Sequence, residues 1–354
     1  MIPPSSTIGI VGGGQLGRML SIAAAYLGYR CHIYAPDEAP PAGDVAAKVT
    51  RGAYDDLDAL GAFAKSVDVA TFEFENVDAG ALAYLGEHVR LAPGPEALAT
   101  AQERVREKRF VRDLGGRTAP FRSVESLADL ERAAAEVGRP GILKTARFGY
   151  DGKGQVRIGE GSNLAEAWAD VGEQPCIYEG FVDFAAEFSI LIARGMDGQS
   201  LVYPVPRNEH RDGILARSTV PAGDPISLQA EDAADLARAV ADRLDYVGLL
   251  TLEFFAGAEG PVFNEMAPRV HNSGHWTIEG ARTSQFENHI RAICGLPLGD
   301  TSLSATDVEM RNLLGAEVED WPSILTDPSA HLHVYGKGEI RPGRKMGHVT
   351  RLRY

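Results

Sequence analysis

The sequence predicts a multi-domain protein of the α/β and α+β classes, in which a parallel α/β domain comes first and an antiparallel domain comes last. Over the first hundred residues, short apolar segments alternate with amphipathic helical segments, as in parallel strands joined by helices. Beyond Phe188, short apolar segments follow one another with one long helical pattern among them, which is typical of antiparallel sheets. The 354 residues suffice for two or three domains with cores of their own.

The N-terminal unit opens with a short buried strand at residues 7–11, which leads into a glycine-rich stretch. A helical pattern then runs from residue 15 to 27 and ends at Gly28, as helices often do. The other elements predicted for this unit are strands at 30–34 and 67–74 and a helix at 56–65. Pro93-Gly94-Pro95 marks its end.

The rest of the chain divides into a middle and a C-terminal segment. A charged helix at residues 96–113 is predicted to lead into the middle segment, which is of βα type and begins near Ala119. Its predicted elements are a helix at 126–137 and strands at 141–144 and 176–178. The predicted C-terminal elements are strands at 188–193, 201–203, 249–255 and 261–264 and a helix at 230–244.

Composition argues against several classes of function. Hydrophobic residues make up 44% of the chain and charged residues 24%, as in ordinary globular proteins. The net charge of −14, from 35 basic and 49 acidic residues, argues against a nucleic-acid-binding surface. Three widely spaced cysteines match no zinc pattern and suit a reducing compartment. Since there is no signal-peptide pattern and no apolar stretch of the roughly 20 residues that span a membrane, we expect a cytoplasmic protein without a membrane partner.

The glycine-rich stretch at residues 12–17 lies between a predicted strand and a predicted helix. Its amides and the helix N-terminus could hold a phosphate or another anion. Asp37, about 20 residues further on, also permits a nicotinamide dinucleotide site. Tight packing of the strand against the helix explains the glycines equally well, so this motif alone leaves three interpretations open.

A second glycine-rich loop, at residues 149–155, follows an apolar strand that ends near Lys144. Three glycines in this loop allow its amides to wrap around a polyphosphate, and Lys144 and Lys153 would add positive charge. A plain hairpin turn would explain the glycines but not the flanking lysines. The pattern therefore favours phosphate binding, although the Gly-Lys-Ser/Thr ending of a P-loop is missing.

The stretch from Asn264 to Trp276 gathers a carboxylate, an arginine, two histidines, two asparagines and a serine. We expect it to be neither a buried strand, because so many polar groups would need partners, nor an amphipathic helix, because Pro268 interrupts it. The pattern favours a functional site over a plain surface loop, since a strand at residues 261–263 runs directly into the stretch. The residue types suit a metal on one side and a small oxyanion on the other.

Glu253 and Glu265 belong to two apolar segments separated by a short glycine-containing turn, a spacing that predicts a hairpin with facing carboxylates. Two facing carboxylates repel each other unless a cation neutralises them, and Mg²⁺ prefers such oxygen ligands. Two solvated strand acids are the weaker alternative, because their neighbours are apolar. The residues that follow could bind a small anion: Arg269, His271, Asn272 and Ser273.

Two further segments are ambiguous. Residues 179–182, with Glu187 nearby, could read an adenine edge and hold ribose hydroxyls, but taken alone they fit an inter-domain linker better. The basic tail from Lys337 to Arg353 could bind the phosphate of an acceptor substrate, and a solvated basic turn is equally compatible with it. Taken together, a lysine-bearing glycine loop, a carboxylate pair and a basic site predict a nucleotide-dependent ligase.

On these residues the chain resembles the ATP-grasp enzymes, and within them most closely the family that carboxylates 5-aminoimidazole ribonucleotide in purine biosynthesis. The resemblance covers nearly the whole chain and rests on residues 12–19, 71–77, 143–155, 264–276, 284–286 and 344–348, of which the last three are specific to that family. It implies an N-terminal α/β domain at 1–100, a lid at 101–182 and an antiparallel domain at 183–354. ATP would lie between the last two, and the protein would be a homodimer.

The resemblance also implies a role for each matching residue. The implied ATP contacts are Arg104, Lys144, Gly149, Tyr150, Asp151, Gly152, Lys153, Gly154, Gln155, Glu179, Gly180, Phe181, Val182, Glu187, His210, Asn264 and Glu265. Glu253 and Glu265 would bind Mg²⁺ or Mn²⁺, and Arg269, His271, Asn272 and Ser273 would bind bicarbonate. The implied ribonucleotide contacts are Gln15, Glu75, Tyr150, Asp151, Lys153, Lys337 and Arg344. Lys153 departs from the family, which often has arginine there.

The implied reaction has two steps. ATP phosphorylates bicarbonate to carboxyphosphate, with Lys144 stabilising the transferred group, and the carboxyl group then passes to the exocyclic amine of the ribonucleotide. Lys144, Asp151, Arg269 and His271 would act in catalysis, with Asp151 positioning the amine or taking its proton. Three alternatives remain: a relative that uses formate and another ribonucleotide, a nicotinamide oxidoreductase, and a nucleotide-binding module without catalysis.

Overall fold

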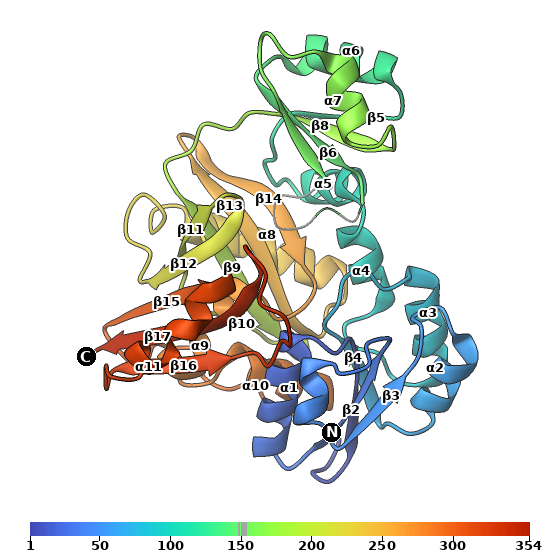
Figure 1. The fold of residues 1–354 in the computed structure, drawn as a ribbon, viewed down its shortest axis with the longest axis vertical. Helices are drawn as coiled ribbons and strands as arrows, with labels where there is room; N and C mark the ends of the chain where they lie inside the picture. Colours follow the sequence, from blue (N-terminus) through green and yellow to red (C-terminus); the bar gives the residue numbers. More distant parts are fainter. Residues whose placement is uncertain (148, 150–153) are drawn as a thin grey trace.

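The computed structural model describes residues 1–147, 149 and 154–354, and within them the strands form three sheets (Figure 1). The N-terminal sheet is parallel, with strand order β3-β2-β1-β4. Its strands are β1 (Thr7–Val11), β2 (Arg30–Ala35), β3 (Lys48–Arg51) and β4 (Val69–Phe72). Its helices are α1 (Gln15–Tyr26), η1 (Pro41–Asp44), α2 (Leu57–Ala64) and α3 (Ala79–His88). The predicted parallel α/β unit is confirmed, although β3 and α3 were not predicted.

The link out of this unit differs from the prediction. In place of one helix at 96–113 there are two, α4 (Pro95–Ala101) and α5 (Arg104–Asp113). The carboxylate of Glu103 accepts hydrogen bonds from the backbone N–H groups of Val105 and Arg106, so it caps the start of α5. This cap allows the chain to change direction, which a continuous helical pattern of side chains does not reveal.

The middle sheet has strand order β5-β8-β6-β7, and all its pairs are antiparallel. Its strands are β5 (Phe121–Val124), β6 (Gly141–Thr145), β7 (Gln155–Ile158) and β8 (Cys176–Gly180), and its helices are α6 (Leu127–Val137) and α7 (Leu164–Asp170). Leu143, Trp168 and Tyr178 belong to its separate apolar core. In Figure 1 this unit stands at the top of the view, joined to the rest beside α5.

The C-terminal sheet is antiparallel, with order β14-β13-β9-β11-β12-β15-β17-β16 and β10 paired to β9. Its strands are β9 (Glu187–Arg194), β10 (Ser200–Val202), β11 (Arg207–Arg211), β12 (Ile214–Val220), β13 (Gly248–Gly257), β14 (Gly260–Ala267), β15 (Asp307–Leu314), β16 (Ala330–Val334) and β17 (Lys345–Arg353). Its helical elements are α8 (Ala230–Arg243), η2 (Asn272–Gly274), α9 (Thr277–Gly280), α10 (Gln285–Cys294), η3 (Gly315–Asp320) and α11 (Trp321–Ile324).

The predicted antiparallel C-terminal domain is confirmed, and β9, β10, β13, β14 and α8 correspond to predicted elements. The strand predicted at 261–264 is longer than expected, because β14 continues through Ala267 and so includes the first residues of the polar stretch. In the fold, α10 packs between α1 and β13 and so joins the N-terminal and C-terminal units. Among the helices that the structure describes, none has the length and apolar character to cross a bilayer.

Candidate functional site

A cleft with a cavity volume of about 890 Å³ is lined by segments from the N-terminal unit, the start of α5, the end of β6 and the C-terminal unit. Many residues with a sequence-predicted role line it: Gln15, Glu75, Arg104, Gly149, Glu253, Glu265, Arg269, His271, Asn272, Lys337 and Arg344. Others that the structure describes lie outside the lining: Lys144, Gly154, Gln155, Glu179, Gly180, Phe181, Val182, Glu187, His210, Asn264 and Ser273. Tyr150, Asp151, Gly152 and Lys153 lie outside the described residues.

The N-terminal glycine loop holds a carboxylate of its own domain. The backbone N–H of Gly14 donates to Oε1 of Glu73 at 2.7 Å, and burial raises the pKa of Glu73. A Cβ atom at Gly12, whose φ is +110°, would come within 2.7 Å of the same oxygen. Close contact with Glu73 thus explains Gly12 and engages the Gly14 amide, while Gly13, Gly14 and Gln15 line the cleft.

The predicted hairpin is present, and it places the two predicted metal ligands opposite each other. Glu253 on β13 pairs in register with Glu265 on β14, and a β-bulge follows directly. Oε2 of Glu265 lies 2.9 Å from Nη1 of Arg104. Burial and, after it, repulsion by Glu265 raise the pKa of Glu253 to about 7. Withdrawal from water works against ionisation of Glu265 as well, but Arg104 outweighs it and lowers the pKa of this carboxyl.

This pair suits a divalent cation. A raised carboxyl pKa beside a second carboxylate is the signature of uncompensated negative charge, which a bound cation would relieve. Among the described residues no cluster of three or more acidic, histidine or cysteine side chains could form a closed protein cage. The arrangement therefore matches Mg²⁺, which usually takes one or two carboxylates together with substrate phosphates and water.

The polar stretch after Phe263 is stabilised by charged side chains of α5. Nζ of Lys108 donates to the backbone carbonyl of Asn264 at 2.9 Å, and the backbone N–H of Met266 donates to Oε1 of Glu107 at 2.6 Å. Arg104 pairs with Glu265 in the same way. These partners explain why the strand can continue through Asn264, Glu265 and Met266, since each of the three has a polar group paired with a side chain of α5.

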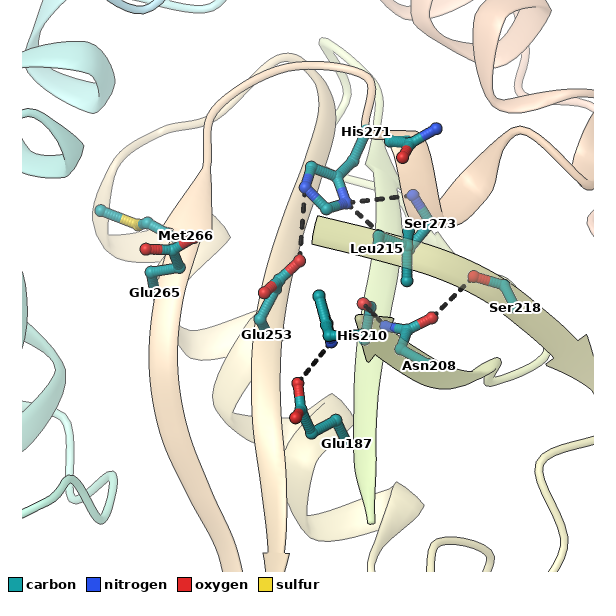
Figure 2. Close-up of polar contacts among 12 residues, drawn as sticks. Glu187, Asn208, His210, Leu215, Ser218, Glu253, Glu265, Met266, His271 and Ser273 are labelled. Atoms are coloured by element: carbon teal, nitrogen blue, oxygen red, sulfur yellow. Dashed lines mark hydrogen bonds and ion pairs between the residues drawn. The ribbon is translucent and has the colours of Figure 1, made fainter. Parts of the chain in front are cut away.

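His271 lies between the carboxylate pair and the short helix η2 (Figure 2). Its Nδ1 accepts a hydrogen bond from the backbone N–H of Ser273 at 3.3 Å and lies 2.8 Å from the Ser273 hydroxyl. Its Nε2 lies 3.3 Å from Oε1 of Glu253. Burial lowers the pKa of His271, so the ring is neutral with its proton on Nε2, directed at the carboxylate.

The four predicted anion-binding residues divide into two kinds. Arg269, His271 and Asn272 line the cleft, and of these Arg269 and His271 carry the ionisable side chains; Nη2 of Arg269 lies 3.0 Å from Oε1 of Glu75. The amide of Asn272 is engaged by Asn312, with reciprocal hydrogen bonds of 3.0 and 2.7 Å, and Ser273 is fully buried beneath His271. The side chains of Asn272 and Ser273 are thus used to hold the loop, which the sequence pattern did not indicate.

A second acid–histidine pair lies below the first. Nδ1 of His210 on β11 is 2.6 Å from Oε2 of Glu187 on β9 (Figure 2). Burial works against protonation of His210, but Glu187 and Glu253 outweigh it and raise the pKa of the ring. Glu253 therefore lies between two imidazoles (Figure 2). His271 belongs to the predicted anion site, and His210 belongs to the predicted ATP contacts.

Lys144 and Glu179 form the centre of the predicted nucleotide region. Nζ of Lys144 donates to Oε2 of Glu179 at 2.8 Å, and Nζ of Lys108 lies 3.1 Å from the other oxygen. Despite its burial, these two lysines lower the pKa of Glu179 to about 2. Sequence reasoning missed Lys108 and Glu107, although the spacing of Arg104 and Lys108, four residues apart on one helix face, was a usable signal.

The basic tail also lines the cleft. Lys337, Arg341, Arg344 and Lys345 line it, and Nζ of Lys337 donates to the backbone carbonyl of Lys345 at 2.7 Å. The tail meets the N-terminal unit, since a Cβ atom at Gly336 would lie 3.2 Å from Oδ2 of Asp44. Positive side chains of the tail and the carboxylate pair thereby line the same cleft.

Comparison with known families gives three matches along the chain. Residues 5–102 match the ribonucleotide synthetase preATP-grasp domain, residues 109–286 the ATP-grasp domain, and residues 309–353 the phosphoribosylaminoimidazole carboxylase C-terminal domain. The N5-carboxyaminoimidazole ribonucleotide synthase of Brucella melitensis is 48% identical over 99% of this chain and 98% of the relative. The chain spans 37% of a longer relative, the bifunctional purine synthesis protein purC/E of Dictyostelium discoideum.

Solved structures resemble the whole fold. An ADP complex of an N5-carboxyaminoimidazole ribonucleotide synthetase matches with a TM-score of 0.95 and 42% identity, covering 99% of this chain and 93% of that one. The synthase from Aspergillus clavatus, in complex with ADP and 5-aminoimidazole ribonucleotide, matches with a TM-score of 0.91 and 30% identity over 98% of this chain and 94% of that one.

Proposed function

Because this chain belongs to the N5-carboxyaminoimidazole ribonucleotide synthase family of ATP-grasp enzymes, we propose that it uses ATP and bicarbonate to carboxylate 5-aminoimidazole ribonucleotide. The products would be N5-carboxyaminoimidazole ribonucleotide, ADP and phosphate, in a step of purine biosynthesis. The observation that carries the proposal is one cleft in which the carboxylate pair, Arg269 with His271, and the basic tail all meet. Such a cleft can hold a phosphoryl donor, a small anion and a phosphorylated acceptor together.

The proposed domain limits are 1–100, 101–182 and 183–354. ATP is proposed to bind beside the middle sheet. The proposed contacts are Arg104, Lys144, residues 149–155, Glu179, Gly180, Phe181, Val182, Glu187, His210, Asn264 and Glu265. Within this set the contacts of Glu179 suggest a specific part, because both its oxygens are held by lysines. We therefore assign the Glu179 carboxylate to orienting Lys144, and leave adenine to the backbone of residues 180–182.

Glu253 and Glu265 are proposed to hold Mg²⁺, or Mn²⁺, whose fit was argued above from their facing geometry. The bound ion would neutralise charge on the phosphoryl group in transfer. His271 would keep the Glu253 carboxylate in place through its Nε2–H, as groups behind a metal ligand commonly do. Arg104 would do the same for Glu265.

Bicarbonate is proposed to bind at Arg269 and His271, with Asn272 and Ser273 shaping the loop beneath them. In the first step a bicarbonate oxygen attacks the γ-phosphorus, the bond to the ADP oxygen breaks, and carboxyphosphate forms. In the second step the exocyclic amine forms a bond to the carboxyl carbon, phosphate leaves, and the amine loses a proton. Asp151 is the proposed proton acceptor, a role that rests on the sequence alone.

The ribonucleotide is proposed to lie between the N-terminal unit and the basic tail, held by Gln15, Glu75, Tyr150, Asp151, Lys153, Lys337 and Arg344. The ion pair between Glu75 and Arg269 joins this site to the bicarbonate site. It would bring the amine next to the activated carboxyl group, which is the main requirement of a two-substrate transfer. A homodimer in the cytoplasm completes the proposal, and the three buried free cysteines suit that reducing compartment.

The test follows a labelled oxygen. With ¹⁸O-bicarbonate, one label should appear in the released phosphate, because the attacking oxygen stays on phosphorus when the carboxyl group leaves. Turnover without label in phosphate would contradict the carboxyphosphate route. Turnover with formate in place of bicarbonate would contradict the carboxylation itself and favour the formate-using alternative.

A further inference from the structure

Lys108 is 1% exposed, which is unusual for a lysine, and it connects two sheets. Its Nζ lies 3.1 Å from Oε1 of Glu179 on β8 and donates to the backbone carbonyl of Asn264 on β14. It also lies 5.8 Å from the ring centroid of Phe263. Burying a charge costs free energy unless partners compensate, so a lysine at this position calls for an explanation.

The explanation lies in the carboxylate that Lys108 shares with Lys144. Glu179 is 4% exposed and has one lysine on each oxygen, at 3.1 and 2.8 Å. Burial lowers the pKa of Lys108, and the Glu179 carboxylate opposes that shift. With both lysines protonated, the two ammonium groups and the single carboxylate add up to one positive charge. Without Lys108, the group would consist of Lys144 and Glu179 alone, and its charges would cancel.

This difference matters to a phosphate that approaches Lys144. A neutral ion pair attracts an anion far less than a group with surplus positive charge, and the low polarity of a buried site enlarges the effect. The other charged residues of α5 do not supply that surplus, because Arg104 is paired with Glu265, and Glu107 is a carboxyl group that accepts a hydrogen bond from Met266. Lys108 is thus the source of the extra charge among these described contacts.

We propose that Lys108 is a positioning residue that lets Glu179 hold Lys144 in place without cancelling its charge toward the phosphates of ATP. The proposal deepens the proposed function, since it rests on the role of Lys144 in binding ATP. A merely structural tie between β8 and β14 makes a different prediction, because its loss would weaken the binding of every nucleoside ligand alike.

The experiment compares ligands that differ in phosphate charge. In Lys108→Met, the Kd of Mg·ATP measured by calorimetry should rise at least about tenfold, while the Kd of adenosine changes less than about twofold. An exposed lysine gives the matched control, and Lys65→Met should leave both constants unchanged. An unchanged ATP affinity in Lys108→Met, or equal losses for ATP and adenosine, would overturn the proposal.

A second variant restores the charge balance. In Lys108→Met/Glu179→Gln the group again carries one positive charge, and the glutamine oxygen can still accept a hydrogen bond from Lys144. Its Mg·ATP affinity should recover to within about threefold of the parent protein, because charge is the quantity being restored. A double variant as weak as the single one, or weak when the single one does not fold, would contradict the charge role.

The binding assay contains neither bicarbonate nor ribonucleotide, so it separates this proposal from the proposed function. A parent protein that binds Mg·ATP but does not carboxylate the ribonucleotide would contradict the function and leave the Lys108 test intact. A parent protein that carboxylates, with a Lys108→Met variant of normal ATP affinity, would contradict only the role of Lys108.

Discussion

Glu253 and Glu265 face each other across β13 and β14, yet their surroundings shift their pKa values in opposite directions. Arg104 ion-pairs with Glu265 and lowers its pKa, whereas burial and repulsion by Glu265 raise the pKa of Glu253 to about 7. Glu265 thus favours the ionised form, and a bound cation would favour ionisation of Glu253 as well. This asymmetry makes the pair the most specific feature of the cleft.

Replacing Glu265 with glutamine should lower kcat by roughly a hundredfold or more, since one cation ligand and the partner of Arg104 are lost together. The loss should be accompanied by a higher Mg²⁺ requirement in steady-state assays. Glu259→Gln is the matched control, because Glu259 lies in the turn of the same hairpin and pairs with Arg117 outside the cleft. Near-normal turnover of Glu265→Gln would remove the metal assignment.

Lys337→Ala should raise the KM for the ribonucleotide by roughly tenfold, as expected for the loss of one charge-assisted phosphate contact. The KM for ATP should change little, since Lys337 belongs to the tail assigned to the acceptor, and the proposed ATP contact Lys144 is held by Glu179. Steady-state kinetics with each substrate varied in turn will measure the split. A defect confined to ATP contradicts the assignment of the tail to the acceptor.

Arg269→Ala should raise the bicarbonate concentration needed for half-maximal turnover by roughly tenfold, because the guanidinium lines the cleft with His271 and its positive charge would bind the anion. It should also weaken the binding of the ribonucleotide modestly, since Glu75 loses its partner. Arg282→Ala serves as the control, because this exposed arginine lies between α9 and α10, pairs with Asp300 and does not line the cleft. Unaltered bicarbonate dependence in Arg269→Ala counts against this anion site.

Lowering the pH should destabilise the packing between the N-terminal and C-terminal units, because His289 lies between them. Its Nδ1 accepts from the backbone N–H of Leu249 and its Nε2 lies 2.9 Å from the hydroxyl of Thr71 on β4. Burial lowers the pKa of His289 to about 4. Because the folded pKa lies below the unfolded value of about 6.5, this contribution to stability is complete above pH 6.5 and is lost as the pH falls toward 4.

The size of this effect is on the order of 3 kcal/mol over that range. Denaturant unfolding measures the free energy of unfolding at several pH values. This free energy should depend less steeply on pH in His289→Gln, because glutamine can keep both hydrogen bonds but cannot titrate. His88→Gln, at an exposed histidine, should retain the full dependence. Identical slopes for His289→Gln and the parent protein would exclude His289 as the titrating group.

Local patterns in the sequence were enough to predict much of the fold. The strand at 7–11 was predicted at its observed limits, and the hairpin that pairs Glu253 with Glu265 followed from apolar segments on either side of a glycine turn. Such elements depend on neighbours in the chain. Strands β15 to β17 were missed because polar residues such as His348 and Thr350 interrupt their apolar pattern while being buried in the fold.

The candidate site was predictable in its residue types but not in its internal contacts. The reciprocal amide bonds of Asn272 join it to Asn312, 40 residues away, and the carboxylate in the glycine loop comes from Glu73. Partners so distant in sequence are created by the tertiary fold. For the same reason Lys108 looked like one charged residue among many on α5, although it lies at the centre of a buried ion group.

The most direct test of the account is phosphate release from Mg·ATP in the presence of bicarbonate, with and without 5-aminoimidazole ribonucleotide. If the chain carboxylates the ribonucleotide through carboxyphosphate, the ribonucleotide should strongly stimulate phosphate release, and removal of bicarbonate should abolish that stimulation. Release that the ribonucleotide does not stimulate, or stimulation that persists without bicarbonate, would contradict that reaction.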